Sequence, residues 1–237
     1  MTVIDVSALR RTFGGLVAVH GIDFTINAGE VIGFIGPNGS GKSTLFNLLT
    51  GVLKPDSGKI RLFGEDIVGR PTHLIARAGV ARTFQIPMLF WNMTLFENLL
   101  AATVEENWAT APSRAEQVLE LLELQHMAHH QARDLSGGQQ RLLEMGRILM
   151  RDPKVVFLDE VAAGVHPRLR EIILAAIRRL RERGVSICVI EHDMELTQSI
   201  CDRMIVMDAG KVIAEGNFDA VTSDPTVMKA YLGDVTL

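Results

Sequence analysis

The chain has 237 residues, of which 47% are hydrophobic, and its 24 basic and 28 acidic side chains give a formal net charge of -4. A chain of this size can bury a core without disulfides or structural metals, so the composition indicates a globular protein. The mild acidity disfavours nucleic acid as a partner, because nucleic-acid binding depends on basic side chains that neutralise phosphates.

Nothing in the sequence has the length and hydropathy of a membrane-spanning helix, and the first residues lack the apolar stretch of a signal peptide. Cys188 and Cys201 are both flanked by apolar residues, and we expect them to be reduced residues of the core. We therefore expect a cytoplasmic chain that does not cross a membrane by itself.

The first third of the chain is predicted to be rich in strands. Short β-type stretches separated by turn residues cover residues 3–9, 19–26 and 30–35. A helical pattern begins at Gly41 and closes at Gly51, and two further strands are predicted at residues 59–63 and 80–83.

The rest of the chain first becomes helical and then alternates between strand and helix. Helices are predicted at residues 95–105, 113–124 and 137–151. The elements predicted next, in the order strand, helix, strand, helix and hairpin, are residues 155–158, 167–183, 185–190, 194–201 and the region around 209–210. This alternation predicts an α/β fold with a parallel sheet.

A glycine-rich loop that fits the pattern G-x-x-x-x-G-K-[ST] connects the strand at residues 30–35 to the first helix. Its glycines allow backbone amides to converge on phosphate oxygens, and the helix start adds its positive end. Lys42 is expected to reach the β- and γ-phosphates, and the Ser43 hydroxyl to coordinate Mg²⁺. The residues expected to bind the nucleotide here are Gly36, Pro37, Asn38, Gly39, Ser40, Gly41, Lys42, Ser43 and Thr44.

Two acidic residues follow the apolar strand at residues 155–158, at the carboxyl end where parallel sheets bind ligands. Adjacent residues of a strand point to opposite faces, so Asp159 and Glu160 are expected to have different tasks. Asp159 suits the Mg²⁺ shell, and Glu160 suits orientation or deprotonation of an attacking water.

The segment Leu-Ser-Gly-Gly-Gln at residues 135–139 leads into the last helix of the helical region. Ser136 is a suitable N-cap, and the two glycines leave the helix start open to an anion. The chain therefore contains two helix starts suited to phosphate.

With these motifs the chain resembles, along essentially its whole length, the ATP-binding subunits of ABC transporters, whose signature LSGGQ it contains. The resemblance implies a P-loop NTPase (RecA-like) core with a mainly parallel sheet, an N-terminal antiparallel β region and an inserted helical subdomain. The core is expected at residues 1–86 and 151–237 and the helical subdomain at residues 87–150, within one ATPase domain. ATP and Mg²⁺ are the implied cofactors.

The resemblance also implies roles for single residues. Gln85 occupies the position of the family's glutamine loop, where its side chain can touch Mg²⁺ or the water. His192 matches the switch histidine, which can donate to the γ-phosphate. Phe13 matches the aromatic residue that stacks on adenine, with ordinary core packing as the alternative.

In this family two ATPase subunits pair head to tail, and each signature covers the nucleotide of the other subunit. The implied partners are a second ATPase subunit, identical or paralogous, integral membrane permease subunits and, for an importer, a periplasmic solute-binding protein. The implied location is the cytoplasmic face of the cell membrane. The signature residues expected to contact the nucleotide are Ser136, Gly137, Gly138 and Gln139.

Two positions depart from the family pattern. Val161 follows Glu160 where the family usually has proline, so we expect a less rigid loop there. His166 replaces the family's aspartate in the next loop, which affects dimer contacts but not ATP binding. Because Glu160 is present, we expect ATP hydrolysis.

Within the family, residues 13–19, 81–85, 191–194 and 230–233 are most similar to importer ATPases for branched-chain amino acids, and also to amide and urea importers. The implied function is import of branched-chain amino acids or similar small polar solutes. Three alternatives stay open: the ATPase of a lipopolysaccharide-type exporter, a non-transport ABC ATPase, and an ATP-binding regulator with little turnover.

Residues 86–100 are rich in large apolar side chains immediately after Gln85. An exposed apolar patch marks a protein contact, so we expect this segment and the helix after it to form a groove for a cytoplasmic helix of a membrane partner. Ordinary packing within the helical subdomain is the alternative. The residues expected to line the groove are Met88, Leu89, Phe90 and Trp91.

Overall fold

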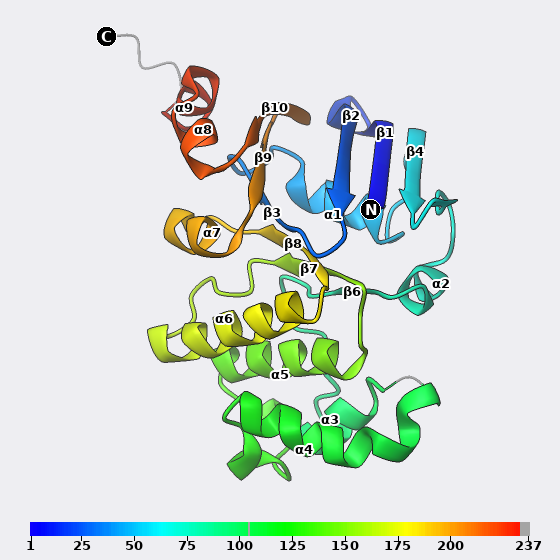
Figure 1. Cartoon of the computed structure of the whole chain (residues 1–237), viewed down its shortest axis with the longest axis vertical. Helices are drawn as coiled ribbons and strands as arrows, with labels where there is room; N and C mark the ends of the chain where they lie inside the picture. Colours follow the sequence, from blue (N-terminus) through cyan, green and yellow to red (C-terminus); the bar gives the residue numbers. More distant parts are fainter. Residues whose placement is uncertain (104, 233–237) are drawn as a thin grey trace.

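The computed structural model describes residues 1–103 and 105–232 (Figure 1). Its strands are β1 (Thr2–Phe13), β2 (Leu16–Asn27), β3 (Val31–Ile35), β4 (Ser57–Leu62), β5 (Glu65–Asp66), β6 (Val80–Arg82), β7 (Val155–Asp159), β8 (Ser186–Ile190), β9 (Arg203–Asp208) and β10 (Lys211–Gly216). Its α-helices are α1 (Lys42–Leu49), α2 (Thr72–Arg77), α3 (Leu95–Leu100), α4 (Ala111–Leu121), α5 (Gly137–Met150), α6 (Pro167–Glu182), α7 (Met194–Ile200), α8 (Phe218–Thr222) and α9 (Pro225–Leu232). Within these ranges no helix is long and apolar enough to cross a membrane.

The strands form two sheets. One is antiparallel, with the order β2-β1-β4-β5. The other has the order β10-β9-β3-β8-β7-β6 and is parallel except for its edge strand β10. β3, β7 and β8 are buried along their whole length, as expected for parallel strands covered on both faces. The predicted α/β fold, with a mainly parallel sheet and an N-terminal antiparallel region, is confirmed.

Helix α1 packs between the two sheets (Figure 1). Phe24 of β2, Phe34 of β3, Phe46 of α1 and Phe157 of β7 form a row of edge-to-face contacts, with ring centroids 5.0 to 5.5 Å apart. These aromatic contacts hold α1 against the sheet, directly behind the glycine-rich loop that connects β3 to α1.

Helices α5 and α6 cover the other face of the parallel sheet, and α3 and α4 lie beyond them (Figure 1). A continuous apolar cluster joins Val156 of β7 and Val189 of β8 to Leu143 of α5 and Ile173 of α6. The helical region therefore shares its core with the sheet, and this core fixes the position of α5.

One predicted helix differs from the structure. The pattern at residues 95–105 predicts a single helix, whereas α3 ends at Leu100 and the 3-10 helix η1 (Glu105–Thr110) leads into α4. Pro112 in the first turn of α4 favours a new helix start at this place. The elements β5, α2, α8 and α9 have no predicted counterpart.

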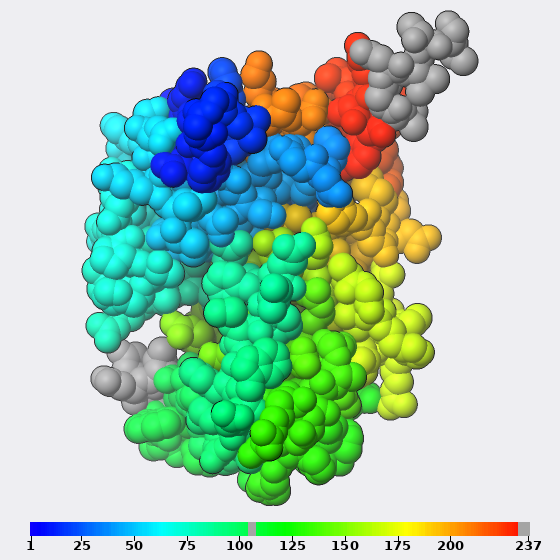
Figure 2. Space-filling view, turned by 180° about the vertical axis from the view of Figure 1, so that it is seen from behind, coloured from blue at the N-terminus to red at the C-terminus, as the bar shows by residue number. Residues whose placement is uncertain are grey.

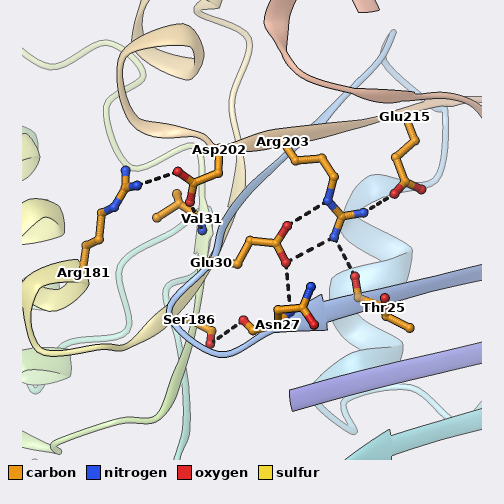
Figure 3. Close-up of polar contacts among 9 residues, drawn as sticks. All are labelled: Thr25, Asn27, Glu30, Val31, Arg181, Ser186, Asp202, Arg203 and Glu215. Atoms are coloured by element: carbon orange, nitrogen blue, oxygen red, sulfur yellow. Dashed lines mark hydrogen bonds and ion pairs between the residues drawn. The ribbon is translucent and has the colours of Figure 1, made fainter. Parts of the chain in front are cut away.

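Figure 3 shows an ion-pair cluster at the amino end of β3. Arg203 of β9 donates from Nε to Glu30 Oε1 at 2.8 Å, donates to the Thr25 carbonyl of β2 at 2.7 Å and contacts Glu215 of β10. Burial alone raises the pKa of Glu30, but the hydrogen bonds from Arg203 and from the Asn27 backbone outweigh burial and hold this pKa below its usual value. The cluster fastens the two sheets together at the end of β3 opposite the glycine-rich loop.

Candidate functional site

The glycine-rich loop is in close contact with β9 of the parallel sheet and with β2 of the antiparallel sheet. Gly36 and Gly41 have φ angles of 145° and 103°, which side chains other than hydrogen rarely permit. A Cβ atom at Gly36 would lie 2.0 Å from the carbonyl oxygen of Met207 in β9, and one at Gly41 would lie 2.2 Å from that of Ala18 in β2. Only glycine fits at either position, so the loop and the start of α1 have a fixed place.

Lys42 is almost completely buried, with 6% of its surface exposed. Its Nζ donates to the carbonyl oxygens of Gly36 and Pro37 at 2.7 and 2.9 Å and to Ser40 Oγ at 3.3 Å. Burial lowers the pKa of Lys42, while the carboxylates of Glu160 and Asp159 act in the opposite direction. The ammonium group thus lies inside the loop, close to the acidic residues of β7.

The solvent-facing edge of the loop consists of Asn38, Gly39 and Ser43, with Thr44 half-buried beside them. Ser43 and Thr44 belong to the first turn of α1, where backbone amides have no acceptor within the helix. This edge therefore offers amide and hydroxyl donors to an anion.

Asp159 ends β7 and is held from two sides. Its backbone N–H donates to Thr83 Oγ1 at 2.9 Å, and its Oδ2 accepts from Arg82 Nη2 at 3.2 Å. Burial raises the pKa of Asp159, and Arg82 acts against this rise. Among the described residues Oδ1 has no hydrogen-bond partner. Neither Arg82 nor Thr83 was predicted as a site residue, because both precede Gln85 without any motif of their own.

Glu160 and His192 lie together, as their assignments to one reaction require. The distance between His192 Nε2 and Glu160 Oε1 is 3.0 Å, and the Glu160 amide donates to the carbonyl of Ile190 at the end of β8. Glu160 has a φ of 49°, an unusual value for a residue other than glycine. The backbone therefore turns sharply here and directs the carboxylate to the edge of the sheet where His192 follows β8.

Glu191 is a further buried acid that was not predicted from the sequence as a site residue. It is 3% exposed, and its Oε1 accepts from the Ala162 amide at 3.1 Å. Burial raises the pKa of Glu191, while the Ala162 amide acts against the rise. Glu191 thereby ties the backbone before His192 to the loop after Glu160. Its neighbour His192 was the only signal in the sequence that could have indicated it.

Gln85 and Phe13 are both exposed. The Gln85 side chain has no hydrogen bond with the described residues, and its carbonyl accepts from Arg141 of α5 at 3.5 Å. Phe13, at the end of β1, is 42% exposed, so the alternative of ordinary core packing is wrong. The guanidinium of Arg11 lies 4.8 Å from the centre of the Phe13 ring.

The signature segment starts α5, as predicted. Ser136 Oγ accepts from the Gln139 amide at 3.4 Å, and Gln139 Oε1 accepts from the Ser136 amide at 2.9 Å, which forms a capping box. Ser136 and Gly137 are exposed, and Gly138 is half-buried beside Leu169 of α6. In the described part of the chain the hydrogen bonds of this segment stay within the helical region, and none reaches the glycine-rich loop.

Val161 and His166, the two residues that depart from the family pattern, each make specific contacts in the structure. Val161 is buried, with 3% of its surface exposed, and belongs to the apolar cluster under α5 and α6. His166 is the N-cap of α6, where its Nδ1 accepts from the Arg168 amide at 3.3 Å. His166 thus takes the capping role that an aspartate could fill equally well.

Residues 19–163 match the family model described as ABC transporter, and residues 211–235 match a model described as branched-chain amino acid ATP-binding cassette transporter. The chain belongs to the ABC transporter family. As an ABC ATP-binding cassette it binds nucleotide and is the ATP-hydrolysing subunit of a transporter. Gly233, the last residue of the tail motif at residues 230–233, lies outside the described residues.

Relatives of this ABC cassette match it over nearly its full length. The high-affinity branched-chain amino acid transport ATP-binding protein BraF of Pseudomonas aeruginosa is 41% identical over 98% of both chains. The corresponding LivG protein of Escherichia coli is 38% identical, also over 98% of both chains. Among solved structures, a nucleotide-free ATP-binding cassette of an ABC transporter has a TM-score of 0.87 at 35% identity, covering 99% of this chain and 100% of its own. An ADP conformation of a cassette has a TM-score of 0.85 at 35% identity, with the same coverage.

Proposed function

We propose that this ABC ATPase powers the import of branched-chain amino acids or similar small polar solutes. Two relatives named for branched-chain amino acid transport match it over nearly its full length, and the family model described in the same terms matches residues 211–235. The observation that carries the chemistry is the 3.0 Å contact between Glu160 and His192, which lies at the end of β7 beside Asp159 and close to Lys42 at the start of α1.

In this proposal the glycine-rich loop and Thr44 enclose the ATP phosphates, and Phe13 stacks on the adenine after Arg11 moves aside. Lys42 leaves the carbonyl oxygens of its own loop and binds the β- and γ-phosphates. Glu160 orients the attacking water and accepts its proton, and His192, whose Nε2 contacts Glu160 in this structure, donates to the γ-phosphate once ATP is bound.

The residues present fit Mg²⁺. The Ser43 hydroxyl and Asp159 Oδ1 are hard oxygen donors, and Oδ1 is left without a hydrogen bond when Arg82 binds Oδ2. We assign both to the ion, with Gln85 as a further ligand. Bound Mg²⁺ would neutralise charge that develops on the β- and γ-phosphates.

The signature serves a second ATPase subunit, identical or paralogous, in a head-to-tail dimer. The exposure of Ser136 and Gly137, together with a helix start that makes no bond to the chain's own phosphate loop, supports this assignment. We divide the chain accordingly into a nucleotide-binding core, residues 1–86 and 151–237, and a helical subdomain, residues 87–150, that presents the signature.

A permease helix is proposed to bind a cavity of about 240 Å³ between α2, α5 and the loop after β6. The cavity is seen as the hollow at the left of Figure 2, between the cyan and green parts of the surface. Of the four residues expected to line a groove, only Met88 lines this cavity, because Leu89 is buried and the exposed Phe90 and Trp91 lie outside it. As the ATPase of an importer, the chain would lie at the cytoplasmic face of the membrane, and a periplasmic solute-binding protein would deliver the solute.

The test is uptake of leucine by proteoliposomes that contain the ATPase, its permeases and the solute-binding protein. Glu160→Gln should lower kcat by about a hundredfold or more while ATP binding persists, because the general base is lost. Glu182→Gln, at the exposed end of α6, is the matched control and should transport normally. ATP-driven efflux would favour an exporter, turnover independent of any permease would favour a non-transport ATPase, and absent turnover in the unmutated complex would favour a regulator.

A further inference from the structure

Three polar side chains of α5, spaced three residues apart on one helix face, hold the glutamine loop (residues 84–88) by its main chain. Two are arginines that donate to loop carbonyls, and between them a glutamate accepts a loop amide. The bonds join Arg141 Nη2 to the Gln85 carbonyl at 3.5 Å, Glu144 Oε1 to the Phe84 amide at 3.2 Å, and the Arg147 guanidinium to the Met88 carbonyl. The loop that carries Gln85 is therefore attached to the helix that begins at the signature.

This attachment leaves other polar atoms of the same three side chains unused. Glu144 is 5% exposed, and its Oε2 is buried without a hydrogen-bond partner in the described part of the chain. Arg141 Nη1 and Arg147 Nε are buried and unpartnered in the same way. Burial raises the pKa of Glu144, while the backbone amides of Phe84 and Met88 and the guanidinium groups of Arg141 and Arg147 oppose this rise. A buried acceptor thus lies unpaired on the same helix face as two buried donors, which is unfavourable and makes a second pairing accessible.

We propose that Glu144 is a positioning residue with two alternative partners, the backbone of the glutamine loop and the guanidinium groups of α5. While Glu144 holds the loop, Gln85 stays attached to α5. When the carboxylate pairs with Arg141 or Arg147 instead, the loop is released and Gln85 moves independently of α5. The cluster is a two-state element of the kind that coupling between distant sites requires.

Two of the proposed contacts can bias this switch. α5 begins at the signature, so contact with the nucleotide of a second subunit acts on the helix that carries Glu144. Phe84, Met88, Glu144 and Arg147 also line the cavity assigned to the permease, so an occupant acts on both partners of the carboxylate. The effects of the second subunit's nucleotide and of the permease on this switch rest on the proposed function. The two alternative pairings of Glu144 do not depend on transport.

The test is amide hydrogen exchange of residues 84–88, measured by mass spectrometry on the full chain in a Glu160→Gln background. Without nucleotide, Glu144→Ala should speed this exchange about tenfold or more, because the acceptor of the loop amide is gone. Glu144→Gln keeps that acceptor but cannot form an ion pair, so the loop should remain protected. In the parent, Mg-ATP should change the protection of the loop, and in Glu144→Gln that response should be absent.

Met145→Val is the matched control, since Met145 is the buried neighbour of Glu144 and makes no polar contact with the loop. This variant should keep both the protection and its response to Mg-ATP, even if its melting temperature falls. With Glu160 restored, Glu144→Ala should lower kcat while KM for ATP stays unchanged, because the phosphate loop is untouched.

Unchanged protection in Glu144→Ala would overturn the proposal, as would a parent-like response to Mg-ATP in Glu144→Gln. The absence of any response in the parent would also overturn the switch. Failure of the proposed function would give a different result. Solute uptake would be missing, while hydrogen exchange measured without nucleotide would still distinguish the Glu144 variants.

Discussion

Arg82 illustrates how much of the site depends on a single buried side chain. It pairs with Asp159 between β6 and β7, and the two side chains are 8% and 6% exposed. It also donates to Asn47 of α1 and to Thr50, the C-cap of this helix, at 2.6 and 3.1 Å, and its guanidinium lies 5.0 Å from the centre of the Phe84 ring. Arg82 therefore joins the acidic end of β7, the helix behind the phosphate loop and the start of the glutamine loop.

Replacing Arg82 should be strongly destabilising. Arg82→Ala leaves Asp159 as a buried carboxylate without its cation, and such losses cost about 3–5 kcal/mol. The exposed pair of Arg70 and Glu65, 43% and 71% exposed, gives the matched control, and Arg70→Ala should cost about 1 kcal/mol or less. Urea unfolding measures both variants, and equal losses would contradict the argument from burial.

At the scale of the element, two helices begin in the same way but have different tasks. α3 starts with a capping box between Thr94 and Glu97, and α5 starts with one between Ser136 and Gln139. Both boxes satisfy amides of the first turn, so both stabilise their helices by similar amounts. Only the start of α5 belongs to the signature that we assign to the nucleotide of a second subunit.

Ser136→Ala and Thr94→Ala should therefore differ in activity but not in stability. Each should lower the free energy of unfolding by about 1 kcal/mol through the lost cap. Ser136→Ala should also lower kcat about tenfold or more, because a donor to the transferred phosphate is lost, whereas Thr94→Ala should leave kcat near the parent value. Thermal melts and steady-state ATPase assays of the assembled transporter check this, and a similar kcat in both variants would contradict a role for Ser136 beyond capping.

At the scale of the whole molecule, the two sheets are fastened together at opposite ends of β3. At the carboxyl end, aromatic packing around α1 and the close approach of β2 to Gly41 hold the phosphate loop. At the amino end, Arg203 joins Glu30, Glu215 and the Thr25 carbonyl (Figure 3). The site thus has a rigid core behind it, while the residues assigned to its partners lie on exposed segments.

The Glu30 carboxylate should give the molecule a pH-dependent stability. Because its folded-state pKa lies below the ordinary value of 4.5, its contribution is complete above that value and is lost as the pH falls through the folded-state pKa. Glu30→Gln should therefore be less stable than the parent by about 1 kcal/mol or more at neutral pH, with the difference shrinking below pH 4.5. Urea unfolding across this range checks it, with the exposed Glu116→Gln as control, and a difference independent of pH would rule out the Glu30 carboxylate as its source.

Patterns within a few consecutive residues were sufficient to predict most of the helices, strands and motifs. The strand around Phe34, the helix start at Ser136 and the acids after Leu158 each depend on a few consecutive residues whose spacing and capping chemistry are visible in the chain. The single helix predicted at residues 95–105 was wrong, because apolar periodicity there does not show where the backbone turns from α3 into a 3-10 helix.

The sequence by itself determined the fold class, the phosphate loop and the signature, because these features arise from neighbouring residues. Only the tertiary structure decided that Arg82 holds Asp159, 77 positions away, and that Glu144 holds Phe84, 60 positions away. It also showed that, of the apolar residues after Gln85, Met88 lines a cavity and Leu89 does not. Such pairings depend on how the helical region packs on the sheet, and an arginine or a glutamate within a single sequence gives no sign of the distant residue it will meet.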